Sequence, residues 1–342
     1  MLAVSSTMPY EPSMNKEKRV NAARLALLDW HAHHGRHDLP WRKKITPYAV
    51  LVSEFMLQQT TVATVKPRFT KWMRVFPTLA DLAGAKEAEV LAVWQGLGYY
   101  SRARRLHTAA KIMQKEHGGV VPIEEKTLLA LPGIGAYTAA AIRAFAFNQH
   151  ALVLDTNILR VLARWANESN PIDKMEGKKA LQQVAKMFYP HKECRAVASA
   201  LMDLGATLCT AGIPHCTRCP LVATCQAADP SLLPRKAPRA LTLKRSEHRV
   251  WFYHNNQLYL EQSQGPRWLG LWILPELGIS KAQGRSLAKI IYPITRYRVT
   301  MTVCQTAQKP PAHLQGFTQE ELKSIPIPSP HRRAIEIALG KL

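Results

Sequence analysis

Four of the six cysteines lie within seventeen residues, at a spacing that suits a metal centre. They are Cys209, Cys216, Cys219 and Cys225, separated by six, two and five residues. Four thiolates in one compact run favour a [4Fe–4S] cluster, because zinc modules usually offer two close pairs with a longer insert between them. The spacing alone leaves zinc open. Cys194 and Cys304 have no partner at metal-ligand spacing, and we expect them to be isolated thiols.

A carboxylate set into an apolar segment is a candidate for acid–base chemistry. The segment covers residues 49–60, and on a helix Glu54 would have Val50 and Leu57 as neighbours about one turn away. Such surroundings should raise the pKa of the carboxyl and keep it protonated near neutrality, as a general acid requires. A Glu at the rim of the apolar stripe, reaching into solvent, fits the same pattern equally well.

A Gly-containing turn separates two helical segments further along the chain. Residues 131–137 read Leu-Pro-Gly-Ile-Gly-Ala-Tyr and precede a small-residue stretch, 138–146. Gly133 and Gly135 allow a tight turn and a close approach to a ligand, and the amides that open the next helix would point outward. This pattern favours a phosphate-binding turn, although a plain connection between helices would also fit it.

Asp155 follows an apolar stretch and precedes a helical segment that runs through Arg160. An Asp at that place is by default the N-cap of the helix, where the helix dipole and the capped amides keep the carboxylate ionised. An ionised Asp155 with a protonated Glu54 would be a pair of carboxyls in opposite states. Such a pair can break a glycosidic bond through an oxocarbenium-like transition state.

Aromatic and basic residues between positions 95 and 105 point to nucleic acid. They read Gln-Gly-Leu-Gly-Tyr-Tyr-Ser-Arg-Ala-Arg-Arg, a Gly-flanked turn directly before a basic helix. An exposed Leu97 or Tyr99 at this turn would wedge into a base stack while the arginines meet phosphates; buried tyrosines at a helix start are the alternative. Trp41 and Arg42 would line a base pocket or simply fasten the first helix.

The elements that would carry these residues are helices. From Val20 to about Gln226, apolar residues recur at three- and four-residue steps with breaks at Gly, Pro or Asn, which predicts an all-α domain. The clearest helical segments are 24–31, 49–58, 87–95, 101–117, 136–147, 157–165 and 178–188.

A smaller α+β domain is expected after a stretch rich in Pro, Lys and Arg. We expect a disordered N-terminus at 1–19, the helical domain at 20–226 with the cysteine loop at 209–225, a linker at 227–245 and the second domain at 246–342. Strands are predicted at 250–253 and 258–261, joined as a hairpin, and at 268–274 and 297–303, with short helices near 318–323 and 332–339.

The overall charge favours a polyanionic partner. The 342 residues include 46 Lys and Arg against 24 Asp and Glu, a formal charge of +22 that is spread along the chain. Nucleic acid is therefore the leading class of partner. No run of about 18 apolar residues occurs, so we expect no membrane span. The first residues lack the apolar core of a signal peptide, and we expect a reducing, cytosolic setting.

Taken in order, these motifs resemble those of the MutY family of adenine DNA glycosylases, which belong to the helix-hairpin-helix glycosylases with an iron–sulfur cluster. The resemblance covers the chain from about residue 30 to 226 and rests on the stretches 53–60, 96–103, 131–137, 153–160 and 209–225. It implies a cytoplasmic, nucleoid-associated bacterial enzyme that is monomeric and makes no membrane contact. The implied partner is double-stranded DNA with A:8-oxoguanine or A:G mispairs, and the implied cofactor is one [4Fe–4S] cluster.

The resemblance also implies roles for individual residues. Glu54 would protonate the extruded adenine, Asp155 would stabilise or capture the developing sugar cation, and Asn157 and Tyr137 would support the site. The implied cluster ligands are Cys209, Cys216, Cys219 and Cys225. The implied DNA contacts are Trp41, Arg42, Gln59, Thr60, Leu97, Tyr99, Gly133, Gly135 and Thr295.

Position 137 and the acid at position 54 discriminate among relatives. Endonuclease III-like members carry in the hairpin a Lys that attacks the sugar and cleaves the strand; Tyr137 stands here, so we expect a monofunctional enzyme. Thymine-mismatch glycosylases can share this Tyr and the Asp, but they typically lack the acid at Glu54 and the C-terminal domain. A bifunctional lyase, a thymine-mismatch glycosylase and a DNA-binding metalloprotein without catalysis are the alternatives.

The second domain resembles the Nudix-like module with which the family checks for 8-oxoguanine opposite adenine. The Nudix hydrolase box is missing, so this domain should bind and not hydrolyse. The lesion-reading loop of the family is usually Phe-Ser-His, and the corresponding stretch here is Ile294-Thr295-Arg296. Thr295 keeps a hydroxyl at the middle position.

Overall fold

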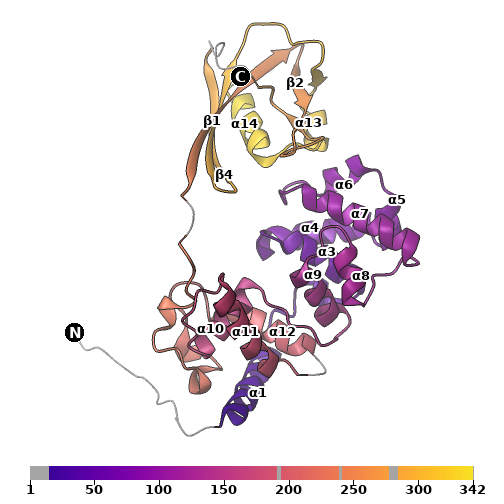
Figure 1. The fold of residues 1–342 in the computed structure, drawn as a ribbon. Coiled ribbons are helices and arrows are strands. Elements are labelled where there is room, and N and C mark those ends of the chain that lie inside the picture. Colours follow the sequence, from indigo (N-terminus) through magenta and orange to yellow (C-terminus); the bar gives the residue numbers. More distant parts are fainter. Residues whose placement is uncertain (1–14, 191–193, 239–240, 277–283, 342) are drawn as a thin grey trace, which may run out of the picture. The chain divides into compact units, whose positions relative to one another are not determined.

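A computed structural model describes residues 15–190, 194–238, 241–276 and 284–341. The chain forms two compact units (Figure 1). The first comprises residues up to 73 with 78–83 and 108–238, and the second comprises 74–77, 84–107 and the residues from 239 on. Within the described ranges, no helix is both long enough and apolar enough to cross a membrane.

The chain is helical up to the cysteine loop, as its apolar periodicity predicted. The α-helices are α1 (Lys16–His34), α2 (Pro40–Lys43), α3 (Pro47–Leu57), α4 (Val62–Val75), α5 (Leu79–Gly84), α6 (Glu87–Val93), α7 (Ser101–Glu116), α8 (Glu125–Ala130), α9 (Ala136–Ala141), α10 (Thr156–Trp165), α11 (Met175–Phe188) and α12 (Cys194–Thr207). The segment expected as one helix at 136–147 is α-helical only to Ala141 and continues as a π-helix, η1 (Ile142–Ala146). Short 3-10 turns follow at η2 (Cys216–Arg218), η3 (Val222–Thr224) and η4 (Pro230–Leu232).

Helix α1 begins earlier than the sequence predicted. Asn15 caps it by accepting a hydrogen bond from the amide of Glu17 at 3.1 Å. Residues 16–19 are therefore helical, which corrects the expectation of disorder for that part of the N-terminus. Residues 1–14 lie outside the described part of the chain.

The core of the first unit lies among α1, α10, α11 and α12. Apolar residues of these helices and of the segment around Val153 form one buried cluster. Trp165 is fully buried in it and packs edge-on against Phe188, with 4.6 Å between the ring centroids. This packing holds the end of α10, and Ile158 in its first turn belongs to the same buried cluster, so the helix that Asp155 caps is fixed at both ends.

The segment expected to be a linker is tied to the first unit for about half of its length. The carbonyl of Arg235 accepts a hydrogen bond from the amide of Ile172 at 3.0 Å, and the amide of Ala237 donates to the carboxylate of Asp173 at 2.9 Å. Residues 239–240 lie outside the described part, and the first strand starts at Leu243.

A mixed sheet with two helices forms most of the second unit. Its strands are β1 (Leu243–His254), β2 (Gln257–Gln262), β3 (Trp272–Ile273), β4 (Ser286–Ile294), β5 (Tyr297–Gln305) and β6 (Gln315–Phe317), and its helices are α13 (Glu321–Ser324) and α14 (Ser329–Leu339). The order is β3-β2-β1-β5-β4, with β6 beside β2, and only β1 and β5 run parallel. This arrangement confirms the α+β class.

The hairpin predicted from the sequence is present. Asn255 and Asn256, with φ of +50° and +58°, connect β1 to β2 in the backbone conformation that favours a two-residue turn. The strand expected at 268–274 is shortened to Trp272–Ile273, because Gly270 turns the chain with φ of +71° just before it. Helix α14 packs on β4 through Ala334 and neighbouring apolar residues.

Candidate active site

Glu54 is buried in the middle of helix α3. Thr46 caps this helix by accepting a hydrogen bond from the amide of Ala49 at 3.1 Å, and Pro47 occupies its first turn. Glu54, further along this helix, is only 6% exposed, so its side chain is buried. Burial raises the pKa of its carboxyl to about 7. The buried interpretation of Glu54 is confirmed, and the solvent-facing one is excluded.

The turn at 131–137 brings Tyr137 to Glu54. Gly133 has φ of +83°, a conformation that favours glycine, and Gly135 is the N-cap of α9. The hydroxyl of Tyr137 is hydrogen-bonded to the carboxyl of Glu54. Burial raises the pKa of Tyr137 well above its ordinary value, so the phenol stays neutral and can donate. The hairpin thus supplies a hydrogen-bond donor directly to the buried acid.

Asp155 caps α10, as predicted. Its Oδ1 accepts a hydrogen bond from the amide of Ile158 at 2.7 Å, and its Oδ2 accepts one from Nδ2 of Asn157 at 2.8 Å. Oδ1 of Asn157 accepts from Nη2 of Arg160 at 2.9 Å, and Nε of Arg160 donates to the carbonyl of Cys209 at 2.7 Å. A continuous hydrogen-bond chain therefore fixes the carboxylate of Asp155 and leads to the first cysteine of the loop.

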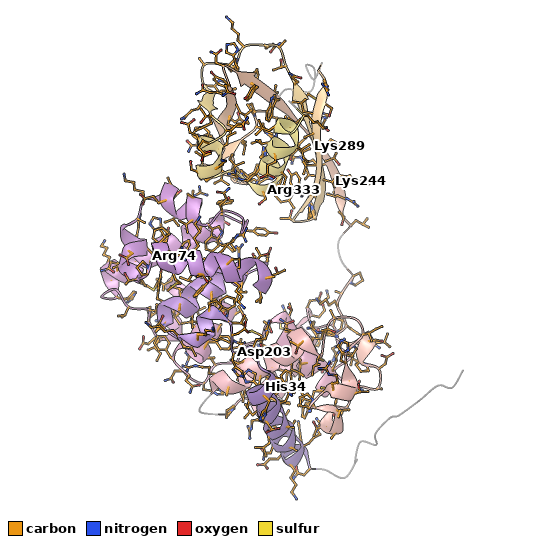
Figure 2. The ribbon with its side chains drawn as sticks, turned by 180° about the vertical axis from the view of Figure 1, so that it is seen from behind. His34, Arg74, Asp203, Lys244, Lys289 and Arg333 are labelled. Carbon is orange, nitrogen blue, oxygen red and sulfur yellow. The ribbon has the colours of Figure 1, made fainter. Side chains whose placement is uncertain are left out.

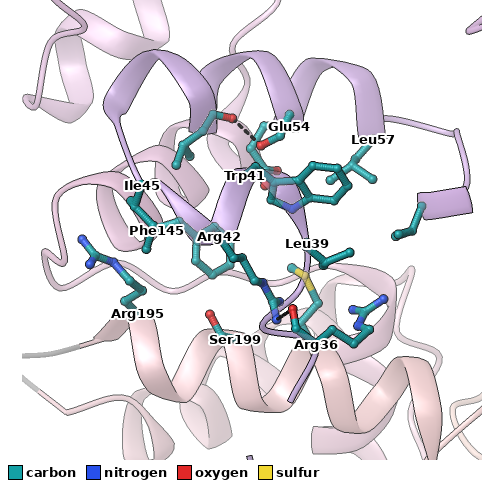
Figure 3. A pocket seen from close by; sticks show the side chains of 14 residues that line it. Arg36, Leu39, Trp41, Arg42, Ile45, Glu54, Leu57, Phe145, Arg195 and Ser199 are labelled. Carbon is teal, nitrogen blue, oxygen red and sulfur yellow. Dashed lines mark hydrogen bonds between the residues drawn. The ribbon is translucent and has the colours of Figure 1, made fainter. Parts of the chain in front are cut away.

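Glu54 lies between a small cavity and a larger cleft. The cavity, of about 60 Å³, has mostly apolar walls that include Leu39, Trp41 and Phe145 (Figure 3). The cleft, of about 940 Å³, is lined by the 131–137 turn, Asp155 and Asn157 among others. The residues that line both spaces are Arg36, Glu54, Leu57, Val62 and Met202. The buried acid therefore faces a pocket that adjoins the cleft holding the second carboxylate.

Trp41 and Arg42 form part of the cavity wall, which supports the first of their two interpretations. Trp41 is buried, lies beside Glu54 under α3 (Figure 3), and packs edge-on against Phe69 at 5.4 Å between ring centroids. Arg42 is held by a buried carboxylate, with 2.6 Å between its Nη1 and Oδ2 of Asp203. The positive charge of Arg42 acts on Glu54 and lowers its pKa, against the effect of burial.

Sequence reasoning missed the cluster that holds this arginine. Asp203, on α12, is fully buried and accepts hydrogen bonds from the amide and Nε of Arg36, both at 2.8 Å, and from Arg42. Nε2 of His31 lies 3.2 Å from Oδ2 of the same carboxylate. A single acid within an apolar helix was the signal that drew attention to Glu54, and the same signal at Asp203 would have found this cluster.

Gln59 and Thr60 lie at the cleft, where α3 ends. Gln59 is exposed with φ of +56°, an unusual conformation for a residue other than glycine. The hydroxyl of Thr60 donates to the carbonyl of Gln58 at 3.3 Å. Both residues line the cleft.

The turn before α7 lies in the second unit and differs in part from expectation. Gly98 and Tyr99 have φ of +68° and +46°, and Tyr99 is 51% exposed. Leu97, in contrast, is buried, so the expectation that it forms an exposed tip is wrong in this structure. Tyr99 is the aromatic residue that this turn presents to solvent.

Two of the three arginines after this turn make hydrogen bonds or ion pairs within the protein. Arg102 is buried and donates to the carbonyls of Leu97 and Gly98 at 2.8 and 3.1 Å. Arg104 forms an ion pair with Glu87 at 2.7 Å. The expectation that these side chains meet phosphates is therefore wrong for Arg102 and Arg104, whereas Arg105 is exposed.

The four clustered cysteines lie in the first unit, near enough that their thiols raise one another's pKa. Cys216 is exposed, and the other three are partly buried. Burial first, and then the neighbouring thiols, raise the pKa of Cys219 to about 12. Nη1 of Arg164 donates to Sγ of Cys209 at 3.3 Å. Across the described residues, no three His, Cys, Asp or Glu side chains are grouped so that they could hold a single metal ion.

The two remaining cysteines are isolated thiols, as the sequence predicted, and Thr295 lies in a turn of the second unit. Cys194 and Cys304 are buried free thiols. Thr295 lies in an exposed two-residue turn that joins β4 to β5. It has φ of +48°, and its hydroxyl donates to the carbonyl of Ile294 at 2.8 Å.

Sequence comparison finds relatives of this chain among DNA repair glycosylases. Residues 52–187 match the family described as HhH-GPD superfamily base excision DNA repair protein. The chain is 36% identical over 256 residues to the adenine DNA glycosylase of Buchnera aphidicola subsp. Baizongia pistaciae, covering 72% of this chain and 70% of that protein. It is 45% identical over 196 residues to the adenine DNA glycosylase of Mycolicibacterium smegmatis, covering 57% and 66%. The matched parts thus make up about two thirds of these relatives.

Solved structures share the fold of the helical part. A thermostable thymine-DNA glycosylase aligns with a TM-score of 0.55 at 30% identity and covers 61% of this chain and 95% of that one. An endonuclease III in a non-covalent complex with DNA aligns with a TM-score of 0.52 at 22% identity, covering 62% and 96%. The second likeness shows the fold alone.

Proposed function

The chain belongs to the family of adenine DNA glycosylases, and on that premise we propose that it removes adenine paired with 8-oxoguanine or guanine in double-stranded DNA. The reaction would hydrolyse the N-glycosidic bond and leave an abasic site, the first step of base excision repair. A buried carboxyl whose pKa is raised to about 7, at the wall of a mostly apolar cavity, is the observation that carries this proposal.

The proposed mechanism begins with a proton from Glu54. An adenine extruded from the duplex would enter the cavity beside Trp41, where Glu54 would protonate the leaving base as a general acid. Tyr137, hydrogen-bonded to Glu54, would hold the carboxyl in place. An acid whose pKa lies near the working pH holds a proton and can still release it, which is the condition for this step.

The second carboxylate would act on the sugar. As the glycosidic bond breaks, positive charge develops at the sugar, and Asp155 at the neighbouring cleft would stabilise or capture it. The hydrogen bonds from Asn157 and from the amide of Ile158 orient its two oxygens. Because Tyr137 stands at the hairpin position where a lyase has its Lys, the reaction would stop at the abasic site and leave the strand intact.

The cysteine loop fits a [4Fe–4S] cluster. The four thiols lie in one short loop and influence one another's pKa, and the guanidinium of Arg164 at 3.3 Å from Sγ of Cys209 suits a site that carries negative charge. Cys209, Cys216, Cys219 and Cys225 would hold the cluster, which when bound would crosslink this loop against α10. Metal analysis of protein purified without oxygen should give about four irons per chain. Stoichiometric zinc would instead identify a zinc site.

The second unit would recognise the base opposite the adenine. Its α+β sheet domain suits a Nudix-like module that binds without hydrolysing, and the exposed turn at Thr295 would contact 8-oxoguanine. Because the hydroxyl of Thr295 donates its hydrogen bond to the carbonyl of Ile294, it would take part in that contact as an acceptor. We further propose that the enzyme acts as a monomer on one duplex.

A single-turnover comparison of duplexes tests the whole proposal. Full-length protein should release base from A:8-oxoguanine and A:G duplexes and leave A:C, T:G and A:T largely intact. The strand should break only after alkali is added. Release from T:G instead would favour a thymine-mismatch glycosylase, strand breakage without alkali would identify a lyase, and no release from any duplex would leave a binding protein.

A further inference from the structure

One face of the C-terminal sheet is exposed to solvent and carries an unusual set of side chains. Strands β1, β5 and β4 lie side by side, and their register places Lys244 beside Arg298 and His248 beside Thr302, which in turn neighbours Lys289. The other face of these strands is buried under α14. Figure 2 shows Lys244 and Lys289 along these strands, with α14 on the opposite face.

The exposed face combines cations with hydroxyl groups. Ser246 and Thr300 lie between the rows that hold the cations, and Thr302 completes the set. None of the nine positions in these three rows is acidic, and none is Phe, Tyr or Trp; the exposed Ile291 and Pro293 complete the rows. The face ends beyond His248, where Val250 is buried against Leu314.

The acidic residues of this part of the chain lie elsewhere. From residue 241 on, the sequence has fourteen Lys and Arg against six Glu and no Asp. On the buried face, Glu247 pairs with Arg267 at 2.6 Å and with Arg249 at 3.6 Å. In the described part of the chain, no ion pair involves Lys244, Lys289 or Arg298. Cations on the buried face are neutralised, and those on the exposed face are left for an external anion.

We propose that this face of β1, β5 and β4 binds the phosphate backbone of duplex DNA. The cations and hydroxyls are side-chain types that contact phosphate oxygens, and the lack of Phe, Tyr and Trp argues against a stacked single strand. Two residues along a strand advance about 6.7 Å, so the distance from the Arg298 row to the Lys289 row is about 13 Å. Phosphates of one DNA strand follow each other at about 3.4 Å along the axis, so the face spans several of them.

The proposal takes its partner, duplex DNA, from the proposed function, but it assigns a surface outside the base-releasing site. The face adjoins the turn at Thr295, and the exposed Arg296 in that turn extends the row of positive charge. Contacts to phosphates carry no sequence information, so this surface would strengthen binding to matched and mismatched duplexes alike.

The test is the salt dependence of DNA affinity for full-length protein. A matched duplex is the probe, and the variant is Lys289→Ala with Arg298→Ala. Each lost phosphate contact lowers the slope of log affinity against log salt by about 0.9, so the double variant should lower it by about 2. Adding Lys244→Ala should lower it by about one more. The matched control, Lys323→Ala with Arg333→Ala, removes two exposed charges from α13 and α14 and should leave the slope unchanged.

The outcomes separate this surface from the rest of the protein. A slope that stays at the wild-type value, or that falls equally in the control, overturns the proposal. So does an unchanged DNA slope combined with lost binding to vesicles of acidic lipid, which would assign the face to a membrane surface. Adenine release at saturating protein should be the same in all variants; if the wild type releases none, the proposed activity fails while the slope still reports on this face.

Discussion

Two carboxyls of the helical unit are both buried, yet their surroundings move their pKa values in opposite directions. Burial raises the pKa of Glu54 to about 7, and the Tyr137 hydroxyl and the more distant charge of Arg42 offset this only in part. Burial acts on Asp203 as well, but hydrogen bonds from His31 and Arg42 and the charge of Arg36 outweigh it and hold the pKa of Asp203 well below its ordinary value. Burial favours the protonated form of both acids, and the partners of each acid decide whether that effect prevails.

This difference separates a functional carboxyl from a structural one. Glu54 keeps a proton because the protein gives it few charged partners, and it lines a cavity in which a bound base would accept that proton. Asp203 joins Arg36 and Arg42, from the start of the chain, to α12. Each substitution below removes one of these carboxyls or the arginine that influences both.

The largest expected effect is on catalysis by Glu54→Gln. Gln has the same shape and can still accept the hydrogen bond of Tyr137, but it has no proton of acidic strength to give. Single-turnover adenine release should fall by about 10²- to 10⁴-fold, which is the usual contribution of a general acid. Affinity for an A:8-oxoguanine duplex should stay within a few-fold of wild type; release at the wild-type rate would show that another group supplies the proton.

The second substitution, Asp203→Asn, should act on stability. Removing the charge leaves the guanidinium groups of Arg36 and Arg42 without their buried counter-charge, and breaking such a pair costs about 3 kcal/mol or more of unfolding free energy. Urea denaturation measures this loss. The exposed Asp29, changed to Asn, is the control and should shift stability by less than about 0.5 kcal/mol. A loss no larger than that of the control would show that the cluster contributes nothing net.

The pH dependence of stability should differ in sign between the two carboxyls. The folded-state pKa of Glu54 is raised, so its contribution is full below the ordinary value of 4.5 and is lost as the pH rises through about 7. That of Asp203 is lowered, so its contribution is full above the ordinary value of 3.8 and is lost as the pH falls towards the folded-state pKa.

Denaturation curves of the two variants across pH check these signs. Glu54→Gln should remove the decline between pH 4.5 and 7, a change of about 3 kcal/mol at most, and should therefore be more stable than wild type above that range. Asp203→Asn should flatten the acid side of the curve. If Glu54→Gln left the curve unchanged, the carboxyl would be ionised in the folded protein at neutral pH.

Part of the candidate site could be predicted from the sequence, and the contacts between separate helices could not. A lone acid in an apolar helix is visible in the chain around Glu54, and a capping Asp before a helix is visible at residue 155. The contact between Glu54 and Tyr137 and the grouping of His31 with Asp203 depend on how separate helices pack, which no local pattern specifies. Leu97 or Tyr99 was expected to be exposed because a tip that wedges into a base stack must reach solvent, and tertiary packing buries Leu97.

The second unit shows the same limit at the level of strands. The β1–β2 hairpin was predicted because Asn255 and Asn256 fit a tight turn. Strand β4 was not predicted, because its alternation is obscured by the exposed Ile291 beside the buried Ile290 and by Pro293 near its end. Short strands such as β6 gain their pairing from a neighbour distant in sequence, and their own residues carry little signal.

The smallest expected effect comes from Arg42→Gln, which tests whether the two carboxyls are coupled. The charge of Arg42 lowers the pKa of Glu54, and it is the weakest of the four influences on that group. Removing it should move the basic limb of the pH profile for adenine release to higher pH, because Glu54 then holds its proton longer. Arg36→Gln is the matched control: Arg36 also pairs with Asp203, at 2.7 Å, so both variants should lose stability. Only Arg42→Gln should move the midpoint of the pH profile. A shift to lower pH, or an equal shift in both variants, would contradict this prediction. It would show that Asp203 acts on Glu54 through the fold and not through the charge of Arg42.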